Sequence, residues 1–310
     1  MVDIISFRKL IPRKLDGVLL LDKPIGLSSN DSLLRVKRLL SAKKAGHTGT
    51  LDPLASGLLP ICFGEATKFS QHLLNADKIY EATMHLGVRT ITGDAEGNMI
   101  DVRPVTCNRI EVDEVLSRFI GKIVQIPPMY SALKHNGKRL YQYARAGHTV
   151  KREGRNVIIR SIKCLAYELP NVMFRVICCK GTYIRTLAED IGEALGCGAH
   201  ITMLRRVGVG TLSLGLAITL DVLSNIDYAT RDTFLHPVDN LLSDFSCVQL
   251  DNTHAKRFLS GQRLNLVPLE KYVGFVRVYT ERKFLGIGRV MNGILRPDRV
   301  ISVTDTVKNS

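Results

Sequence analysis

Residues 46–57 are the stretch that most constrains how this chain can fold. They read Gly-His-Thr-Gly-Thr-Leu-Asp-Pro-Leu-Ala-Ser-Gly, a loop-like composition with three glycines. Glycine allows backbone conformations that other residues rarely adopt, and Pro53 fixes its own φ and favours an extended Asp52 before it. A loop this constrained usually holds a side chain in a defined position. Judged by residue types alone, Asp52 is more often the hydrogen-bond acceptor of a turn, and a preorganised nucleophile or acid/base group is the alternative.

The charge of the chain indicates the kind of partner it meets. Its 310 residues include 43 Lys and Arg against 29 Asp and Glu, a formal net charge of +14. A surplus this large favours a polyanionic partner, with nucleic acid ahead of an anionic membrane. No apolar run approaches the roughly 20 residues that a membrane span needs. The seven cysteines form no C-x-x-C pair, which is typical of free thiols in a reducing compartment, so we expect a cytoplasmic protein.

Hydrophobic periodicity predicts both strands and helices in the larger part of the chain. Apolar runs and alternating patterns indicate short strands, and apolar residues three or four positions apart indicate helices. Strand-like patterns occur at 17–22, 78–86, 156–168, 171–179 and 200–209 with an apolar run at 58–63, and helical patterns follow 28–30, lie at 112–119 and run from 184 to 195.

The pattern changes near residue 245, which indicates a second domain. A helix is predicted at 253–260, with short strands at 272–279, 284–290 and 298–303 and turns at 281–282 and 292–293. We therefore expect one domain over residues 1–246 and a small, mostly β domain over residues 247–310.

Residues 127–152 combine basic and aromatic side chains. The segment contains no acid, and the first acid after it is Glu153. Basic side chains interleaved with aromatic ones suit phosphates and stacked bases, which favours RNA contact over a merely solvated loop and helix. The residues concerned are Lys134, Lys138, Arg139, Arg145, Lys151 and Arg152, together with Tyr130, Tyr141 and Tyr143.

Two further side chains can be related to Asp52. Arg185 falls in the first turn of a predicted helix, where a cation opposes the helix dipole and needs an anion nearby, and Asp52 is a candidate for that anion. Tyr80 is expected on the apolar side of the strand at 78–86, where a core tyrosine is the ordinary interpretation. The sequence has no metal-ligand cluster, Walker A motif or G-x-S-x-G motif, and no Ser or Cys completes a triad with His47. We therefore expect chemistry by one carboxylate, with neither metal nor cofactor.

Five motifs, in order across nearly all of residues 17–206, resemble a known family. They read GVLLLDKPIGLSSNDSL, KKAGHTGTLDPLASGLLPICFGEATKF, KIYEATMHLG, PPMYSALKHNGKRLYQYARAG and CKGTYIRTLAEDIG. They are similar to motifs of the bacterial TruB-type tRNA pseudouridine synthases. The resemblance implies an α+β pseudouridine-synthase fold around a mixed, mainly antiparallel sheet in a catalytic domain. It also implies a PUA-like RNA-binding domain at the C-terminus.

The same resemblance implies a function. The expected reaction is isomerisation of uridine 55 in the T-arm of tRNA to pseudouridine, with the base flipped out of its stack. Asp52 would attack the nucleoside, on either the base or the sugar carbon, so that the glycosidic bond breaks and re-forms through carbon. Residues 127–152 would be an inserted thumb that grips the T-loop. This insertion favours the stand-alone bacterial enzymes over the guide-RNA-dependent relatives that lack it, and we expect a monomer.

Residue roles carry over where the motifs match. The resemblance implies that Arg185 pairs with Asp52 and keeps the carboxylate ionised and aimed. It implies that Tyr80 stacks on the flipped uracil and can take the final proton, so Asp52, Tyr80 and Arg185 are the expected catalytic residues. The expected RNA-binding residues are His47, which fills space among displaced bases; Leu204, which lines the base pocket; Lys23, which with Pro24 buttresses the catalytic loop; and Lys134, Arg145 and Tyr183.

The chain departs from the family pattern at two places. The family usually has an acid where this chain has Ile91, and Asp94 is a candidate to replace that acid. The family also tends to have a threonine after the double arginine at 205–206, where this chain has Val207. Neither departure touches the expected catalytic residues.

Two other functions are compatible with parts of the sequence. Thr48-Gly49-Thr50 beside an acid is superficially similar to loops of aspartyl-phosphate phosphotransferases, but there the acid precedes the threonines and further Mg²⁺-binding acids are needed. A non-catalytic RNA-binding protein would keep the basic charge and the C-terminal domain, with Asp52 in a structural role. Conversion of uridine, and its dependence on Asp52, separates these alternatives from the synthase.

Overall fold

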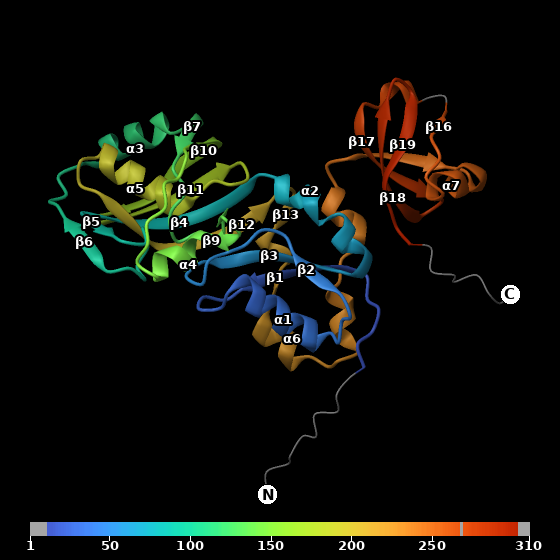
Figure 1. Cartoon of the computed structure of the whole chain (residues 1–310), viewed down its shortest axis with the longest axis horizontal. Helices are drawn as coiled ribbons and strands as arrows, with labels where there is room; N and C mark the ends of the chain where they lie inside the picture. The colour runs from blue at the N-terminus through green and yellow to red at the C-terminus, as the bar shows by residue number, and fades with distance from the viewer. Residues whose placement is uncertain (1–10, 267–268, 303–310) are drawn as a thin grey trace, which may run out of the picture.

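The computed structural model describes residues 11–266 and 269–302, and two β-sheets divide this part of the chain (Figure 1). A ten-stranded sheet forms the larger unit, and a five-stranded sheet forms a smaller C-terminal unit. The predicted α+β class is confirmed. The large sheet is mixed and mainly antiparallel as expected, with parallel pairing where β1 (Gly17–Lys23) meets β14 (Ile218–Thr219) and where β3 (Ser56–Phe63) meets β12 (Ala199–Val209).

Strand β12 lies at the centre of the large sheet. It pairs in parallel with β3 on one side and antiparallel with β4 (Lys78–Leu86) on the other. Every residue of β3 is buried, which explains why its sequence is a continuous apolar run rather than an alternating one. The full strand order is β14-β1-β3-β12-β4, then β11 (Asn171–Cys178), β10 (Arg155–Glu168) and β7 (Gly121–Gln125), with β2 (Ala45–His47) on β3 and β13 (Leu212–Ser213) on β12.

The helices begin and end where local signals predict. Ser28 caps α1 (Ser29–Leu39) through its side chain, and Asn108 forms a capping box with Glu111 at the start of α3 (Arg109–Arg118). Helix α5 (Ile184–Ala194) ends before Gly196, which has a φ of +81°. The other helices are α2 (Ser70–Asn75), α4 (Leu140–Arg145), α6 (Leu220–Asn225) and α7 (Asn252–Leu259), with 3₁₀ turns at Gly64–Lys68, Leu214–Leu216, Thr230–Phe234, Val238–Leu242 and Leu269–Lys271.

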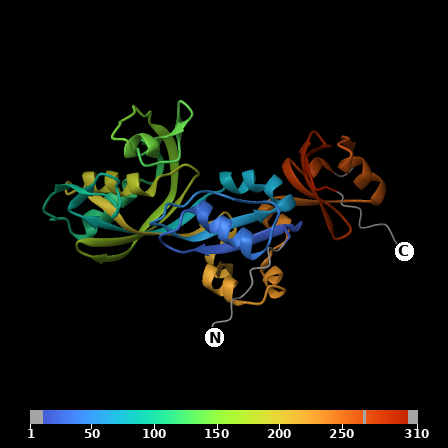
Figure 2. The ribbon, with the colours of Figure 1, turned by 60° about the horizontal axis from the view of Figure 1, so that its bottom comes forward.

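Residues 127–152, the thumb segment, leave the sheet between β7 and β10. They form the small hairpin of β8 (Lys134–His135) and β9 (Lys138–Arg139) and then helix α4. Figure 2 shows this segment, in green, rising from one end of the large sheet. A second hairpin, β5 (Val88–Thr90) with β6 (Met99–Val102), extends from the end of β4. The thumb segment therefore starts at the β10-β7 edge of the large sheet, whereas the second hairpin starts from the more central strand β4.

The C-terminal unit has its own core, and its first strand begins one residue before the predicted boundary at 247. Strand β15 (Ser246–Leu250), which was not predicted, pairs in parallel with β17 (Gly274–Thr280), and β18 (Lys283–Met291) follows. Strand β19 (Ile294–Val300) starts four residues before the predicted strand at 298–303, because the turn at 292–293 leads directly into it; residue 303 lies outside the described residues. The strand order is β15-β17-β18-β19-β16, where β16 is Leu264–Asn265.

The two units touch through aromatic and polar contacts. The rings of Phe69 and Phe284 lie 5.5 Å apart, and the Tyr279 hydroxyl donates to the Asp239 carboxylate at 2.6 Å. Lys68 Nζ donates to the carbonyl of Val300 at 3.1 Å. These contacts join the C-terminal sheet to the 3₁₀ turns at Gly64–Lys68 and Val238–Leu242 and to Phe69, which follows the first of them. None of the helices in the described residues is long and apolar enough to cross a membrane.

Candidate active site

Hydrogen bonds from outside the loop hold residues 48–55 in place between β2 and β3. The buried Ser29 hydroxyl donates to the carbonyl of Leu51 at 3.0 Å and accepts from its N–H at 2.7 Å. The carbonyl of Pro53 accepts from the Gly26 N–H at 2.8 Å. The Asp52 side chain, between these two anchors, keeps 44% of its surface exposed. The loop therefore presents a carboxylate to solvent from a fixed backbone.

Arg185 connects that carboxylate to the protein interior. Its side chain is only 6% exposed, and its Nη2 lies 2.9 Å from Asp52 Oδ2. Nη2 also donates to the carbonyl of Tyr130 at 2.6 Å, and Nη1 to the carbonyl of Thr92 at 2.9 Å. The structure thus brings together Asp52 and Arg185, which lie far apart in sequence, and the guanidinium is fixed by groups besides Asp52.

A second carboxylate contacts the same arginine. Asp94, in the loop between β5 and β6, is 3% exposed, and its Oδ2 lies 3.1 Å from Arg185 Nη1. Asp94 also accepts from the Thr92 hydroxyl at 2.5 Å. Ile91, at the position of the family's usual acid, is 57% exposed. Asp94 therefore supports the arginine, a role that the sequence left open.

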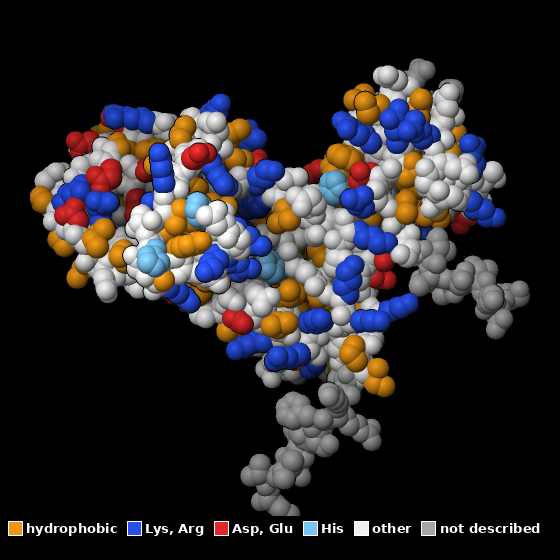
Figure 3. All heavy atoms as spheres, viewed as in Figure 1, with side chains coloured by type: hydrophobic (Ala, Val, Ile, Leu, Met, Phe, Trp, Pro, Cys, Tyr) orange, Lys and Arg blue, Asp and Glu red, His pale blue; other side chains and the backbone are white. Residues whose placement is uncertain are grey.

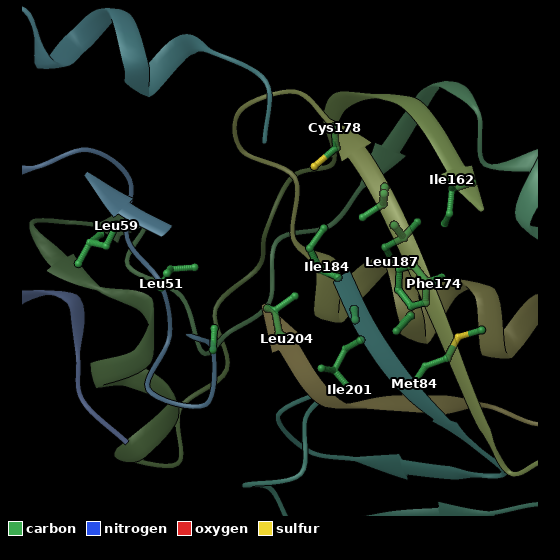
Figure 4. Close-up of a cluster of buried hydrophobic side chains, with 14 of the residues drawn as sticks. Leu51, Leu59, Met84, Ile162, Phe174, Cys178, Ile184, Leu187, Ile201 and Leu204 are labelled. Atoms are coloured by element: carbon green, nitrogen blue, oxygen red, sulfur yellow. The ribbon is translucent and has the colours of Figure 1, made fainter. Parts of the chain in front are cut away.

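Leu51 of the loop and Ile184, next to Arg185, belong to one apolar cluster with Leu204 and Tyr80. Tyr80 lies half-buried on β4, and Leu204 is 7% exposed on β12, where it pairs in register with Ala82. Figure 4 shows Ile184 and Leu204 between Leu51 of the loop at 48–55 and the rest of this cluster. Burial raises the pKa of Tyr80, and the guanidinium of Arg206 opposes that rise. The phenol is therefore protonated at neutral pH.

His47 and Lys23 lie on the β1–β3 side of the site. Burial, followed by the charge of Arg206, lowers the pKa of His47, so its ring is neutral at neutral pH. Lys23 is fully buried, and its Nζ donates to the carbonyls of Pro24 at 2.8 Å and Leu27 at 2.6 Å. Burial also lowers the pKa of Lys23 to about 8. An ammonium with no exposed surface has no access to RNA, so the structure argues against direct RNA contact by Lys23 and places it as a support for the turn at 24–27.

The thumb segment carries the exposed members of the predicted set. Lys134 and Arg145 are both exposed, and the guanidinium of Arg145 lies 5.5 Å from the ring centre of Tyr141. Figure 3 shows Lys and Arg side chains over the face to which α4 belongs. Tyr183, half-buried at the start of α5, donates through its backbone N–H to Gln125 Oε1 at 3.0 Å. Tyr183 thus lies where the thumb leaves β7.

Three family models cover most of the chain. A "TruB family pseudouridylate synthase (N terminal domain)" model matches residues 37–184. A "tRNA pseudouridylate synthase B C-terminal domain" model matches 185–243, and a "Pseudouridine synthase II TruB, C-terminal" model matches 246–301. The chain belongs to the TruB family of pseudouridylate synthases. Its identification from the sequence motifs is confirmed.

Individual relatives agree with this family. Proteins named "tRNA pseudouridine synthase B" from Burkholderia lata, Burkholderia mallei and Cupriavidus taiwanensis are 67%, 64% and 57% identical to this chain. The matches cover 96%, 93% and 94% of this chain and 94%, 98% and 96% of the relatives, respectively. The match is therefore nearly end to end.

Solved structures share the fold of this TruB-family chain. One is an H/ACA RNP bound to a substrate RNA containing 2′-deoxyuridine, at 26% identity and a TM-score of 0.70, over 93% of this chain and 86% of that chain. Another is a Cbf5-Nop10-Gar1 complex, at 29% identity and a TM-score of 0.67, over 89% and 78% of the two chains.

Helix α5, which carries Arg185, also carries Asp190, whose negative charge opposes folding. Burial, with a smaller contribution from Glu193, raises the pKa of Asp190 from 3.8 to about 6. The folded chain then binds this proton more tightly than the unfolded chain does. Tighter proton binding by Asp190 in the folded chain therefore contributes fully to the free energy of unfolding below pH 3.8, and this contribution is lost as the pH rises through about 6. We expect Asp190→Asn to raise the free energy of unfolding by about 1–2 kcal/mol near neutral pH and by much less near pH ~4.

Urea denaturation at the two pH values measures this difference. Glu114→Gln, at an exposed position of α3, is the matched control and should change little at either pH. An equal effect of Asp190→Asn at both pH values would contradict the assignment.

Proposed function

We propose that this chain converts uridine 55 in the T-loop of tRNA to pseudouridine. The observation that carries the proposal is the pair of Asp52, a partly exposed carboxylate on an anchored loop, and Arg185, a buried cation that holds it. The relatives named tRNA pseudouridine synthase B support tRNA as the substrate. The exposed basic side chains of the thumb segment support a polyanion beside the site.

The proposed reaction is an isomerisation, so substrate and product have the same composition and no co-reactant is needed. The bond between C1′ of the ribose and N1 of the uracil breaks, the freed base turns, and C5 bonds to C1′. A proton then leaves C5 and N1 gains one. Asp52 supplies the carboxylate that assists cleavage, and Arg185 keeps it oriented toward the nucleoside.

The substrate base has to leave its stack to reach Asp52, which costs a few kcal/mol. Tyr80 and Leu204 offer aromatic and apolar surface to the displaced uracil. Because burial raises the pKa of Tyr80, the protonated phenol favours the stacking role of this residue over that of a proton acceptor. His47, neutral at the rim of the same loop, would occupy space among the displaced bases.

Mapping of pseudouridine in an unmodified tRNA transcript tests the proposal. The purified full chain is incubated with the transcript in buffer that contains EDTA, and carbodiimide-treated RNA is read by primer extension. We expect a new stop at position 55 alone, and none in a matched transcript with cytidine at that position. A modification at another uridine would overturn the T-loop assignment, and absence of any product would overturn the enzymatic one.

The thumb segment gives a separate prediction about affinity. Reversing two exposed cations in Lys134→Glu/Arg145→Glu is expected to weaken tRNA binding about tenfold or more at low salt. The salt dependence of the affinity should also become shallower, because fewer counterions are released on binding. Filter binding over a series of salt concentrations measures both quantities.

The control makes the same charge change on a different surface. Arg109 and Arg118 are exposed on α3, and Arg109→Glu/Arg118→Glu should have a much smaller effect. If the two double variants bind tRNA equally well, the thumb segment does not grip the RNA.

A further inference from the structure

Arg206 has the largest fully buried side chain among the described residues. It lies on β12, between β3, which follows the loop with Asp52, and β4, which carries Tyr80. It is 1% exposed on β12. Its backbone pairs with Gly57 of β3, at the end of the catalytic loop, and with Tyr80 of β4. One residue therefore joins the strand that follows Asp52 to the strand that carries Tyr80.

The Arg206 side chain reaches into the catalytic loop. Its Nε donates to the carbonyl of Leu58 at 2.7 Å, and its Nη2 donates to the carbonyl of Gly49 at 3.1 Å. Gly49 and Asp52 belong to the same loop, so the guanidinium adds an anchor to those at Leu51 and Pro53. The backbone of the loop is thus held on both sides of Asp52.

Two glycines lie beside Arg206. A Cβ at Gly57 would lie 2.3 Å from the carbonyl oxygen of Arg206, and Gly57 has a φ of +101°. A Cβ at Gly49, with a φ of +83°, would lie 3.4 Å from Arg206 Nη1. Glycine at 57 is therefore required by the close backbone of β12, and glycine at 49 is favoured by its positive φ rather than by lack of space.

The charge of Arg206 is not used in an ion pair. Within residues 11–266 and 269–302, no carboxylate pairs with it, whereas the neighbouring Arg205 pairs with Asp22 at 2.6 Å. A buried charge is costly, and an apolar side chain of similar volume often stabilises a fold as well or better. Packing alone therefore does not explain an arginine here, whereas its hydrogen bonds to loop carbonyls do.

We propose that Arg206 is a positioning residue for the isomerisation, and that it sets the placement of Asp52 relative to Tyr80. This inference rests on the proposed function. Without the guanidinium, the carbonyl of Gly49 loses its partner and the loop gains freedom, although Asp52, Arg185 and the thumb segment stay intact. Because a displacement of about 1 Å at a reacting group can cost about 100-fold in rate, the effect should fall on the chemical step rather than on RNA affinity.

Single-turnover conversion of tRNA and its equilibrium binding, measured on the same proteins, separate these effects. Arg206→Met is expected to lower the single-turnover rate constant about 100-fold and to change the Kd for tRNA by less than about threefold. Arg206→Lys, which keeps the charge but offers one nitrogen to two carbonyls, should recover about tenfold of that loss.

Lys78→Met is the matched control. Lys78 is also a buried cation, 6% exposed and two residues from Tyr80 on β4, and its Nζ donates to the carbonyls of Leu73, Leu74 and Ala76, which lie outside the catalytic loop. This variant removes a buried cation as Arg206→Met does, yet it should keep the single-turnover rate constant within about twofold of the original.

Three outcomes would overturn the inference. One is an Arg206→Met rate within threefold of the original, another is a rate loss shared equally by Lys78→Met, and the third is a loss confined to Kd. If Arg206→Met does not fold, Arg206→Lys decides, since an unchanged rate there removes the role. Failure of the original chain to make pseudouridine in this assay overturns the proposed function instead.

Discussion

Asp52→Asn is expected to abolish pseudouridine formation and to leave tRNA binding nearly unchanged. Asparagine has almost the same volume and can still accept a hydrogen bond from Arg185, but it has no negative charge to assist cleavage of the glycosidic bond. The expected loss in rate is on the order of 10⁴-fold or more, the scale at which enzymes lose activity when the attacking group is removed. Single-turnover assays with excess protein, followed by pseudouridine mapping, measure it.

The control replaces another acid near the same site. Glu96, in the loop that holds Asp94, is exposed and accepts no hydrogen bond from Arg185, so Glu96→Gln should convert tRNA at close to the original rate. Product formation by Asp52→Asn at more than a trace would show that the reaction does not depend on this carboxylate. Loss of binding together with activity would instead assign Asp52 to RNA recognition.

Arg185→Met is expected to reduce both activity and stability. It removes the cation shared by Asp52 and Asp94 and leaves Asp94 buried without its charged partner. Breaking a buried pair in this way costs about 3–5 kcal/mol, which corresponds to a fall of roughly 10 °C in thermal midpoint for a domain of this size. Activity should fall with the orientation of Asp52. Calorimetry and the single-turnover assay give the two quantities.

A second substitution separates the two losses. Arg185→Met/Asp94→Asn also removes the buried Asp94 charge that Arg185→Met leaves without a partner. The double variant should therefore recover most of the lost stability but none of the activity. A double variant no more stable than Arg185→Met would show that the buried Asp94 charge is not the cause. Recovery of activity in the double variant would show that Arg185 does not act through Asp52.

Local patterns predicted the framework that carries the site. Alternation placed Tyr80 on a strand, and helical spacing placed Arg185 in a first turn, where the helix dipole already required an anion. Glycine and proline marked the loop at 46–57, but residue types alone favoured a structural Asp52, and its catalytic role was predicted from the family resemblance. Tyr80 and Arg185 were placed from their neighbours in sequence, and the structure agrees on the strand and on the first helical turn.

Features that depend on tertiary burial could not be obtained in this way. Arg206 and Lys23 have charged side chains, which are almost always exposed, and no local pattern marks these two as enclosed. Asp94 lies in a polar loop where several hydroxyls and acids are equivalent by sequence, and only the fold directs one of them at Arg185. Strand β15 has only five residues, three of them exposed, so its apolar signal is weak.

The parallel contact between β3 and β12 has a mechanical consequence. It consists of the pairs Arg205–Ser56 and Arg206–Gly57, whereas β12 pairs with β4 along its length. The two halves of the large sheet are therefore joined by only these two residue pairs. The strand that follows the Asp52 loop lies on one side of this junction and Tyr80 of β4 lies on the other, so the relative placement of these two side chains depends on backbone pairing at two positions.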